Sequence, residues 1–386
     1  MYFKSAITTE ADPTAAVSHL KKSLDGVHPD LLLIFVSHHY GPDYDELLTA
    51  IRDAINTRNL IGCTGESIIG PDREIERAPA IAVWAAKLPD VRVLPFVVDQ
   101  NDVQSLDGAE AWRDHLGVKT DEAPGFIVLP DPFSIDAESC LEQMDDAFPG
   151  SKIVGGLASG ANAPGQNRLF LGDQVLRQGL VGVSLSGPIA IHAVVSQGCR
   201  PIGEPFVVTK ADQNVIFELR GKPVLEVLRQ VYNAAPPADQ ELMQQGLHVG
   251  RVVDERLGKF GPGDFLIRNL MGVVNDEAVA INALVRPGQT IQFHVRDSKT
   301  ADEEMKNLLT GKVTTMPRPP MGGLLFSCNG RGSRLFGAAN HDIGLVNKIA
   351  GNCEVAGFFA AGEIGPVGDK TFIHGFTSSL ILFHKA

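Results

Sequence analysis

Three short apolar runs, each followed by a segment of helical periodicity, divide much of the chain into similar repeats. The runs cover residues 31–36, 126–129 and 324–326, and each is short enough to be a buried strand. A polar loop follows each run, and apolar residues then recur every three or four positions, as on one face of a helix. These helical stripes are Leu47, Leu48, Ile51, Ala54 and Ile55 in repeat 1, Cys140, Leu141, Met144 and Phe148 in repeat 2, and Leu345, Val346 and Ile349 in repeat 3.

Each repeat then reaches a glycine-rich turn and a further strand. The turns lie at residues 61–66, 154–160 and 356–363, about 30 residues after the middle of the first strand. Because one order of elements recurs three times, the sequence has the signature of a repeat architecture. It predicts an α/β fold with mixed sheets, in which helices cover one face of the strands. The closing strands are expected at residues 80–85, 179–185 and 376–383.

The region between repeats 2 and 3 has a different pattern. Two hairpins are predicted, one from residues 206–209 and 215–219 and one from 278–285 and 290–295. Helices are predicted after Pro223 and from Thr300 onward. Two proline-rich segments, 233–240 and 311–323, are predicted to be the least regular. We therefore predict two domains, 1–220 and 221–386.

Composition and charge exclude several classes of protein. The chain has 386 residues and a formal charge of −12, so a surface built to neutralise nucleic-acid phosphates is not expected. Five cysteines, with no Cys-x-x-Cys pair, suit a reducing compartment better than a disulfide framework. No signal peptide and no apolar segment of membrane-spanning length is apparent. We expect a cytoplasmic protein with no membrane association and no nucleic-acid partner.

Several strings resemble the FIST family. The first half is similar to the FIST N-terminal domain at residues 61–66 and 154–156. The second half is similar to the FIST C-terminal domain at residues 206–228, 328–332 and 357–377. The resemblance implies an N-terminal and a C-terminal FIST domain in one sensory unit that binds small ligands such as amino acids. No output segment of the kinds joined to longer family members is present, so the resemblance implies a separate signalling partner, or no signalling output.

The glycine turns are candidate binding elements. A missing Cβ lets backbone N–H groups approach a ligand, so three turns at one end of the sheets could form a cleft that binds an anion. The alternative is that these glycines only allow tight connections between strands. The candidate residues are Gly62, Cys63, Gly65, Glu66, Gly155, Gly156 and Ser159.

Two arginines and two glutamates are candidate ligand clamps. Arg331 is expected to project from the small loop formed by Asn329, Gly330 and Gly332, and its guanidinium suits a carboxylate. Arg200 is a second candidate clamp. The alternatives are an arginine that braces the loop through backbone carbonyls and, for Arg200, a structural salt bridge. Glu66 and Glu363 are expected to occupy equivalent places in two repeats, because each directly follows a turn glycine. Either could accept a ligand ammonium group or, alternatively, cap backbone N–H groups.

An enzyme remains the alternative class of function. Cys328 could be a nucleophile, with His374 as its base and Glu363 or Asp369 orienting the histidine. Adjacent His38 and His39 lack a metal-binding spacing and would point to opposite faces of a strand, so no metal is predicted. No glycine-rich nucleotide-binding string follows a predicted strand, so no cofactor is predicted either. We prefer a protein that binds an amino acid or similar metabolite in a cleft between domains, with His374 also a candidate ligand contact. The alternative is a cysteine-dependent hydrolase or transferase.

Overall fold

The computed structural model describes residues 1–261 and 263–386, which form two compact units. The first unit comprises Met1–Val195, Lys306–Ile373 and Thr377–Ala386, and the second comprises Ser196–Met305 and His374–Phe376. The second unit is therefore mainly one continuous segment inserted into the chain of the first. The predicted domains 1–220 and 221–386 divide the chain differently from these units and stay a prediction.

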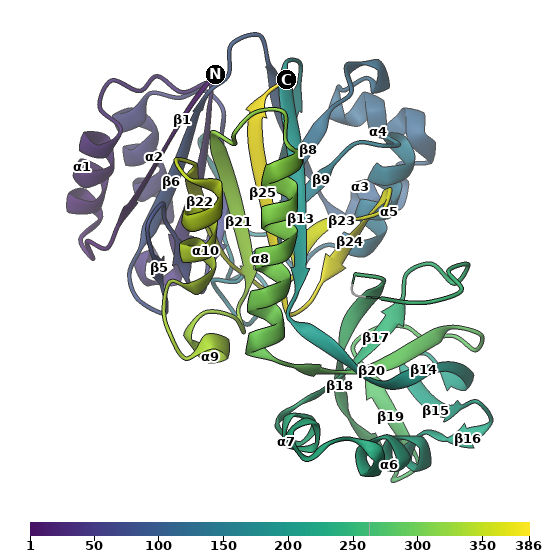
Figure 1. Ribbon diagram of the computed structural model, residues 1–386. Coiled ribbons are helices and arrows are strands. Elements are labelled where there is room, and N and C mark those ends of the chain that lie inside the picture. Colours follow the sequence, from purple (N-terminus) through teal and green to yellow (C-terminus); the bar gives the residue numbers. More distant parts are fainter. Residues whose placement is uncertain (262) are drawn as a thin grey trace. The chain divides into compact units, whose positions relative to one another are not determined.

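The three predicted repeats are present in the first unit and confirm the mixed α/β fold (Figure 1). In each repeat the first two strands pair in parallel and the closing strand pairs antiparallel with the first. Repeat 1 contains β2 (Leu31–Ser37), α2 (Tyr44–Ile55), β3 (Leu60–Gly65) and β6 (Ile81–Lys87). Repeat 2 contains β8 (Gly125–Pro130), α5 (Ala137–Ala147), β9 (Ile153–Gly156) and β12 (Leu180–Ser186). Repeat 3 contains β21 (Gly322–Cys328), α10 (His341–Ala350), β22 (Glu354–Ala360) and β25 (Thr377–Lys385).

Each repeat also passes a hairpin to the sheet of another repeat, which the sequence did not predict. The sheet orders are β1-β6-β2-β3-β10-β11, β24-β23-β9-β8-β12-β7 and β13-β25-β21-β22-β4-β5. Repeat 1 thus receives a hairpin from repeat 2, repeat 2 from repeat 3, and repeat 3 from repeat 1. The hairpins are β4 (Ile68–Ile69) with β5 (Glu74–Ile75), β10 (Leu169–Leu171) with β11 (Gln174–Leu176), and β23 (Glu363–Val367) with β24 (Lys370–His374).

Each repeat is accompanied by an additional strand and by further helices. One strand borders each sheet beside the closing strand. These strands are β1 (Tyr2–Thr8), β7 (Arg92–Val98) and β13 (Ile189–Gln197). The helices α1 (Pro13–Ser23), α3 (Gln100–Ser105) and α4 (Gly108–Leu116) accompany the first two repeats, and α8 (Ser298–Thr315) and α9 (Ser333–Phe336) accompany the third.

One glycine at the same place in each repeat allows the two parallel strands to approach closely. A Cβ on Gly62 would lie 2.1 Å from the carbonyl oxygen of the neighbouring strand, and one on Gly155 or Gly357 would lie 1.8 Å from it. Real Cβ atoms do not come so close to an oxygen. These glycines are therefore required inside β3, β9 and β22 by strand packing.

The three sheets share one apolar core. Phe35 and Leu33 of repeat 1, Ile127 of repeat 2 and Phe326 of repeat 3 all belong to it. The rings of Phe35 and Phe326 lie 6.1 Å apart between centroids, across two repeats. Alternate residues of β2 and β8 belong to two outer cores beneath α1 and α2 and beneath α4 and α5, the helices on the left and right of Figure 1. Each of these sheets is thus buried on both faces, which explains the continuous apolar runs.

The second unit is an antiparallel barrel flanked by two helices. Its sheet order is β14-β20-β17-β18-β19-β15-β16, and an additional β14–β15 pairing closes the ring. Ile216, Val249 and Phe293 are among the residues of its core. The strands are β14 (Cys199–Asp212), β15 (Val215–Leu219), β16 (Lys222–Pro223), β17 (Leu247–Val252), β18 (Phe265–Val274), β19 (Ala278–Ile281) and β20 (Thr290–Arg296), and the helices are α6 (Val224–Ala234) and α7 (Pro237–Gln245).

The second predicted hairpin of this region is wrong. Strand β19 pairs with β18 and β15, whereas β20 pairs with β14 and β17, so the two segments do not pair with each other. The first hairpin, β14 with β15, is confirmed. The two segments expected to be irregular are also partly helical, because α7 begins at Pro237 and α8 continues to Thr315.

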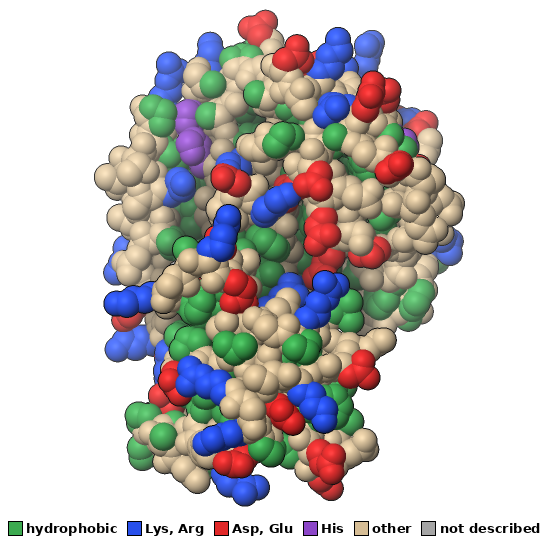
Figure 2. All heavy atoms as spheres, turned by 90° about the vertical axis from the view of Figure 1, so that its right-hand side faces the viewer, with side chains coloured by type: hydrophobic (Ala, Val, Ile, Leu, Met, Phe, Trp, Pro, Cys, Tyr) green, Lys and Arg blue, Asp and Glu red, His purple; other side chains and the backbone are tan. Residues whose placement is uncertain are grey.

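The surface carries charges of both signs. Basic and acidic side chains are interspersed over the face shown in Figure 2. Because solvent and salt screen such mixed charges over about 8 Å, local groups decide which ligands bind, despite the formal charge of −12. None of the helices in residues 1–261 and 263–386 has the length and apolar character that a membrane span requires.

Candidate functional site

The three glycine turns meet through backbone hydrogen bonds. Leu157 N donates to Gly362 O at 2.8 Å, and Ser159 N donates to Thr64 O at 3.0 Å. The third contact is from Phe359 N to Ser67 O at 2.9 Å. These three amides bind neighbouring turns, so their N–H groups are not available to a ligand. The turns instead fix the positions of the side chains around them.

A pocket of about 1040 Å³ lies beside the turns, and all three repeats contribute to it. Its volume is at the upper end of the range for small-molecule sites. Three of the predicted site residues, Glu66, Ser159 and Asn329, line it. The other lining residues are His38, His39, Gly41, Pro42, Tyr44, Arg77, Gly160, Ala161, Asn162, Ala163, Gln166, Arg168 and Arg334.

Glu66 is the one carboxylate among the lining residues, and two arginines hold it. Its Oε1 lies 3.0 Å from Arg334 Nη2 and 3.6 Å from Arg77 Nε. Arg334 is held further by its Nη1, which donates to Asn329 O at 2.9 Å. The Glu66 side chain is 26% exposed, so a ligand can still reach it.

Ser159 positions Glu66 through the backbone. Its hydroxyl is buried, accepts a hydrogen bond from Glu66 N at 3.0 Å and donates to Phe359 O. Both functions of the hydroxyl are therefore used by contacts between repeats. Ser159 joins the turns of all three repeats and sets where Glu66 enters the pocket.

Arg168 supplies a positive charge without a carboxylate partner among the described residues. Its Nη1 donates to the carbonyls of Gly165, Gln166 and Asn167 at 2.8 to 3.0 Å, and its guanidinium lies 5.7 Å from the centre of the Tyr44 ring. These contacts hold the arginine at one wall of the pocket. Its charge remains available to an anionic ligand.

Arg77 and Asn329 have features typical of a binding site. Arg77 has φ of 51°, in the left-handed region that side-chain-bearing residues rarely adopt. Such strain tends to occur at functional sites. Asn329 Oδ1 is buried and has no hydrogen-bond partner in the part of the chain that the structure describes. A buried acceptor of this kind is satisfied when a donor binds near it.

Arg331 does not project from its loop, and this expectation is wrong. Its side chain is 0% exposed, and it donates from Nε and Nη2 to the two oxygens of Asp342 at 2.7 and 2.9 Å. Ser327 Oγ also donates to this carboxylate, at 2.7 Å. Burial acts to raise the pKa of Asp342, but the charge of Arg331 and these hydrogen bonds lower it overall. Arg331 thus braces α10 through Asp342.

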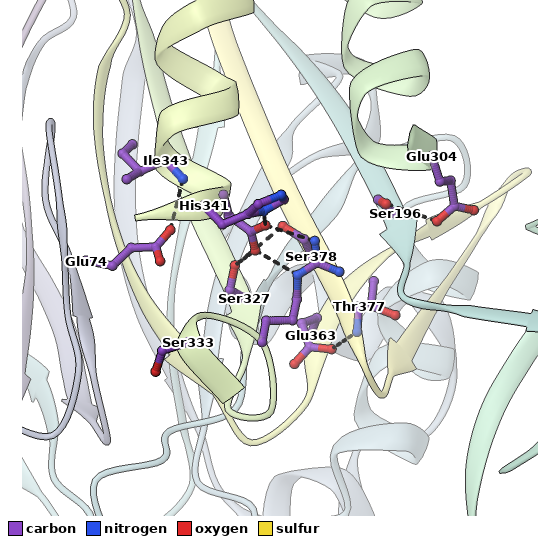
Figure 3. Close-up of polar contacts among 12 residues, drawn as sticks. Glu74, Ser196, Glu304, Ser327, Ser333, His341, Ile343, Glu363, Thr377 and Ser378 are labelled. Carbon is purple, nitrogen blue, oxygen red and sulfur yellow. Dashed lines mark hydrogen bonds and ion pairs between the residues drawn. The ribbon is translucent and has the colours of Figure 1, made fainter. Parts of the chain in front are cut away.

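Glu363 is also fully buried, and it is not the counterpart of Glu66. Its Oε2 accepts a hydrogen bond from Thr377 N at 3.0 Å (Figure 3). Glu363 begins β23, opposite Gly156, and Ile68 begins β4, opposite Phe358. Gly156 and Phe358 occupy the same place in their repeats, directly after the closely approaching glycine. The register therefore makes Ile68 the equivalent of Glu363, and the equivalence expected from the sequence is wrong.

Arg200 belongs to the second unit, where it forms salt bridges. Its Nε donates to Asp297 at 2.9 Å, and its Nη2 donates to Asp239. The side chain is 26% exposed. The structural salt bridge, the alternative for this residue, is what the structure shows.

The residues of the enzyme hypothesis are distributed over both units. Cys328 ends β21 in the first unit and is partly exposed, whereas the other four thiols are buried. His374 is assigned to the second unit. Asp369 is exposed between β23 and β24. Catalysis by these residues stays a prediction.

The adjacent histidines are arranged differently from the expectation. His38 and His39 lie in a 3-10 helix, and their rings stack at 4.0 Å between centroids. They do not point to opposite faces of a strand. No cluster of three or more potential metal ligands occurs within residues 1–261 and 263–386.

Sequence reasoning missed the three arginines of the pocket. Arg77, Arg168 and Arg334 come from three repeats and share no motif. Arg334 alone had a local signal, because it lies two residues after Gly332 in the string that drew attention to Arg331. They meet because segments of all three repeats come together at the pocket.

Comparison with known proteins confirms the predicted family. The FIST N domain matches residues 30–222 and the FIST C domain matches residues 225–366. Two uncharacterized proteins are similar over 371 residues, which is 95% of this chain and 94% of each relative. They are Rv0628c of Mycobacterium tuberculosis (strain H37Rv), 41% identical, and Mb0898c of Mycobacterium bovis, 38% identical.

Among solved structures, a cyanuric acid hydrolase from A. caulinodans aligns with 100% of this chain and 99% of its own, at 10% identity and a TM-score of 0.39.

The family matches cover most of the chain, and FIST domains are generally small-ligand sensory domains. This chain belongs to the FIST family.

Proposed function

We propose that this chain is a sensory protein that binds an amino acid, or a similar small metabolite with a carboxylate, in the pocket of the first unit. The observation that carries the proposal is the lining of that pocket. Glu66 can accept an ammonium group, and Arg168 can bind a carboxylate. The pocket therefore contains the two complementary groups that a zwitterion requires.

The backbone supports a ligand that contacts both groups. Arg168 N donates to Thr64 Oγ1 at 2.9 Å, and Thr64 N donates to Arg168 O at 2.9 Å. Thr64 is two residues before Glu66 in the chain. Glu66 and Arg168 therefore extend from neighbouring stretches of backbone. In this arrangement the ligand carboxylate contacts Arg168 and its ammonium group contacts Glu66.

The signalling output is proposed to pass through a separate protein. The pocket is lined by the 160–168 loop of repeat 2 and by Arg334 of α9 in repeat 3. A ligand that competes for Glu66 changes the contacts of Arg77 and Arg334. The partner is proposed to recognise this change in how repeats 1 and 3 are joined.

A thermal-shift screen of the twenty L-amino acids and their deaminated acids tests this function. Ligand at 100 times its dissociation constant adds about 2.7 kcal/mol to stability, a readily measured shift. Calorimetry on a hit then compares Arg168→Ala with Arg177→Ala, an exposed arginine outside the pocket. We expect at least a tenfold loss of affinity for Arg168→Ala, since ~1.4 kcal/mol is a factor of ten.

Glu66→Gln tests the ammonium contact separately. The substitution should weaken binding of the amino acid more than binding of the matching deaminated acid, because the deaminated acid has no ammonium group to contact Glu66. If no compound shifts the unfolding temperature, or if Arg168→Ala binds as tightly as Arg177→Ala, the proposed function is wrong.

A further inference from the structure

A second arginine of the barrel presents a carboxylate-binding edge that no described residue occupies. Arg296 ends β20, and its Nε and Nη2 are buried with no hydrogen-bond partner within the residues the structure describes. These two nitrogens form the edge of the guanidinium whose parallel N–H groups bind a carboxylate with two hydrogen bonds. Arg331 uses the same two atoms to bind Asp342.

A buried histidine with an unused nitrogen lies on the same face of the sheet. His248 pairs with His294 across β17 and β20, and Arg296 is two residues beyond His294. Residues two apart on a strand share a face, so His248 and Arg296 are diagonal neighbours. The His248 side chain is 8% exposed, and its Nδ1 has no hydrogen-bond partner among the described residues.

The charges around this face favour an anion. Burial lowers the pKa of His248 to about 4, and the positive charge of Arg296 acts in the same direction. Asp297, the carboxylate nearest in sequence, is bound by Arg200. A carboxylate arriving from outside the chain would satisfy Arg296 and favour a proton on His248.

Phe376 covers both groups in a strained conformation. Its ring centre lies 4.2 Å from that of His248 and 5.0 Å from the Arg296 guanidinium carbon. Its backbone φ is 63°, which a bulky residue rarely adopts. Strain of this kind is maintained by surrounding contacts and often occurs at ligand clamps. Gly198 N, which donates to Phe376 O at 3.0 Å, is one such contact.

We propose that Arg296 and His248 form a second binding site, for the carboxylate of a small organic acid, and that the Phe376 ring is its cover. The site is built from residues of the second unit alone, so it does not depend on the pocket proposed above. The acid's two oxygens bind the Nε and Nη2 edge of Arg296. Its remaining group takes the place of the Phe376 ring.

Ligand-observed NMR on the full chain tests the site, with formate, acetate and benzoate as probes at constant ionic strength. We expect at least one probe to bind, and Arg296→Lys to weaken it tenfold or more, because an ammonium group cannot reproduce two parallel donors. The control is Arg251→Lys, an arginine of β17 whose Nη1 bonds Leu284 O, which should leave the affinity unchanged. Arg168→Ala should leave unchanged the part of the binding that Arg296→Lys weakens, which separates this site from the first pocket.

Phe376→Gly tests the cover and should improve binding several-fold. Glycine adopts φ of 63° without strain, and its substitution removes the ring that the ligand must displace. A variant that failed to fold could not show tighter binding. The proposal is overturned if neither the parent protein nor Phe376→Gly binds any probe, or if Arg296→Lys and Arg251→Lys have the same affinity.

Discussion

Two arginines, one in each unit, differ in whether the guanidinium edge formed by Nε and Nη2 has a hydrogen-bond partner. Arg331 is fully buried and its Nε and Nη2 are bound by Asp342, whereas the same two atoms of Arg296 are buried without a partner among the described residues. A buried donor without an acceptor costs about 1–3 kcal/mol, so the two residues serve different purposes. Arg331 stabilises the fold, and Arg296 is suited to a ligand. The local sequence around each arginine does not reveal this difference, because the presence or absence of a partner decides it.

Asp342→Ala makes Arg331 resemble Arg296, and we expect the largest effect from it. Removal of one partner of a buried ion pair leaves an uncompensated charge and costs about 3–5 kcal/mol. Urea denaturation followed by circular dichroism measures the loss in the free energy of unfolding.

The double variant Arg331→Met, Asp342→Leu is the matched control. It removes both charges, so it should lose clearly less stability than Asp342→Ala. If both proteins lose the same free energy, the pair is important for its packing and not for its charge, and the contrast with Arg296 fails.

Features that depend on local patterns could be predicted from the sequence, whereas features that depend on a partner elsewhere in the chain could not. The repeats were predictable because each sheet is buried on both faces and needs one glycine where parallel strands meet, and both requirements leave local patterns. The fate of Arg331 was not predictable, because Asp342 lies eleven residues away on the first turn of α10. A string rich in glycine looks the same whether its arginine faces inward or outward.

The hairpin exchange and the barrel depend on pairings that leave no local pattern. Ile68 of repeat 1 pairs with Phe358 of repeat 3, nearly three hundred residues later. Because of that pairing, Ile68 and not Glu66 lies at the position equivalent to Glu363. The two glutamates therefore differ in position, although each follows a turn glycine. Strands β19 and β20 likewise look like a hairpin but occupy separate places in the barrel. Sequence proximity favours a hairpin only where no other strand inserts between the two.

Glu74 extends the comparison to carboxylates, and its effect should be intermediate. Asp342 has partners at both oxygens, whereas Glu74 Oε1 accepts from Ile343 N at 2.9 Å and Oε2 is buried without a hydrogen-bond partner among the described residues (Figure 3). Burial raises the pKa of Glu74 to about 7, and the nearby charge of Asp342 adds to this. Glu76 acts in the same direction, and His341 acts against it.

The sign of the pH dependence follows from this raised pKa. Below pH ~4.5 both folded and unfolded chains hold the proton, and between ~4.5 and ~7 only the folded chain does. The contribution of Glu74 is therefore fully present in acid and is lost as the pH rises through 7. At ~1.4 kcal/mol per pKa unit, the loss is at most about 3.5 kcal/mol.

Glu74→Gln should remove this loss. The variant should be more stable than the parent at pH 8 and about equal to it at pH 5, as measured by urea denaturation at both values. His341→Gln removes the other titratable group beside Asp342. It should keep the loss of stability between pH 5 and pH 8, because Glu74 is still present. If the free energies of unfolding of Glu74→Gln and the parent differ by the same amount at both pH values, Glu74 is ionised throughout.

Arg200 separates the effect of burial from the effect of a partner, and we expect the smallest change there. Its Nε and Nη2 are bound by Asp297 and Asp239, as those of Arg331 are bound by Asp342, but its side chain is 26% exposed. Water can solvate the carboxylates when the arginine is removed, so Arg200→Met should cost only about 1 kcal/mol. The loss should shrink further between 0.05 and 0.5 M salt, because exposed pairs are screened and buried pairs much less so.

A loss as large as that of Asp342→Ala, unchanged by salt, would mean that an occupied donor edge is important regardless of burial. Burial would then not distinguish Arg331 energetically from the more accessible arginines.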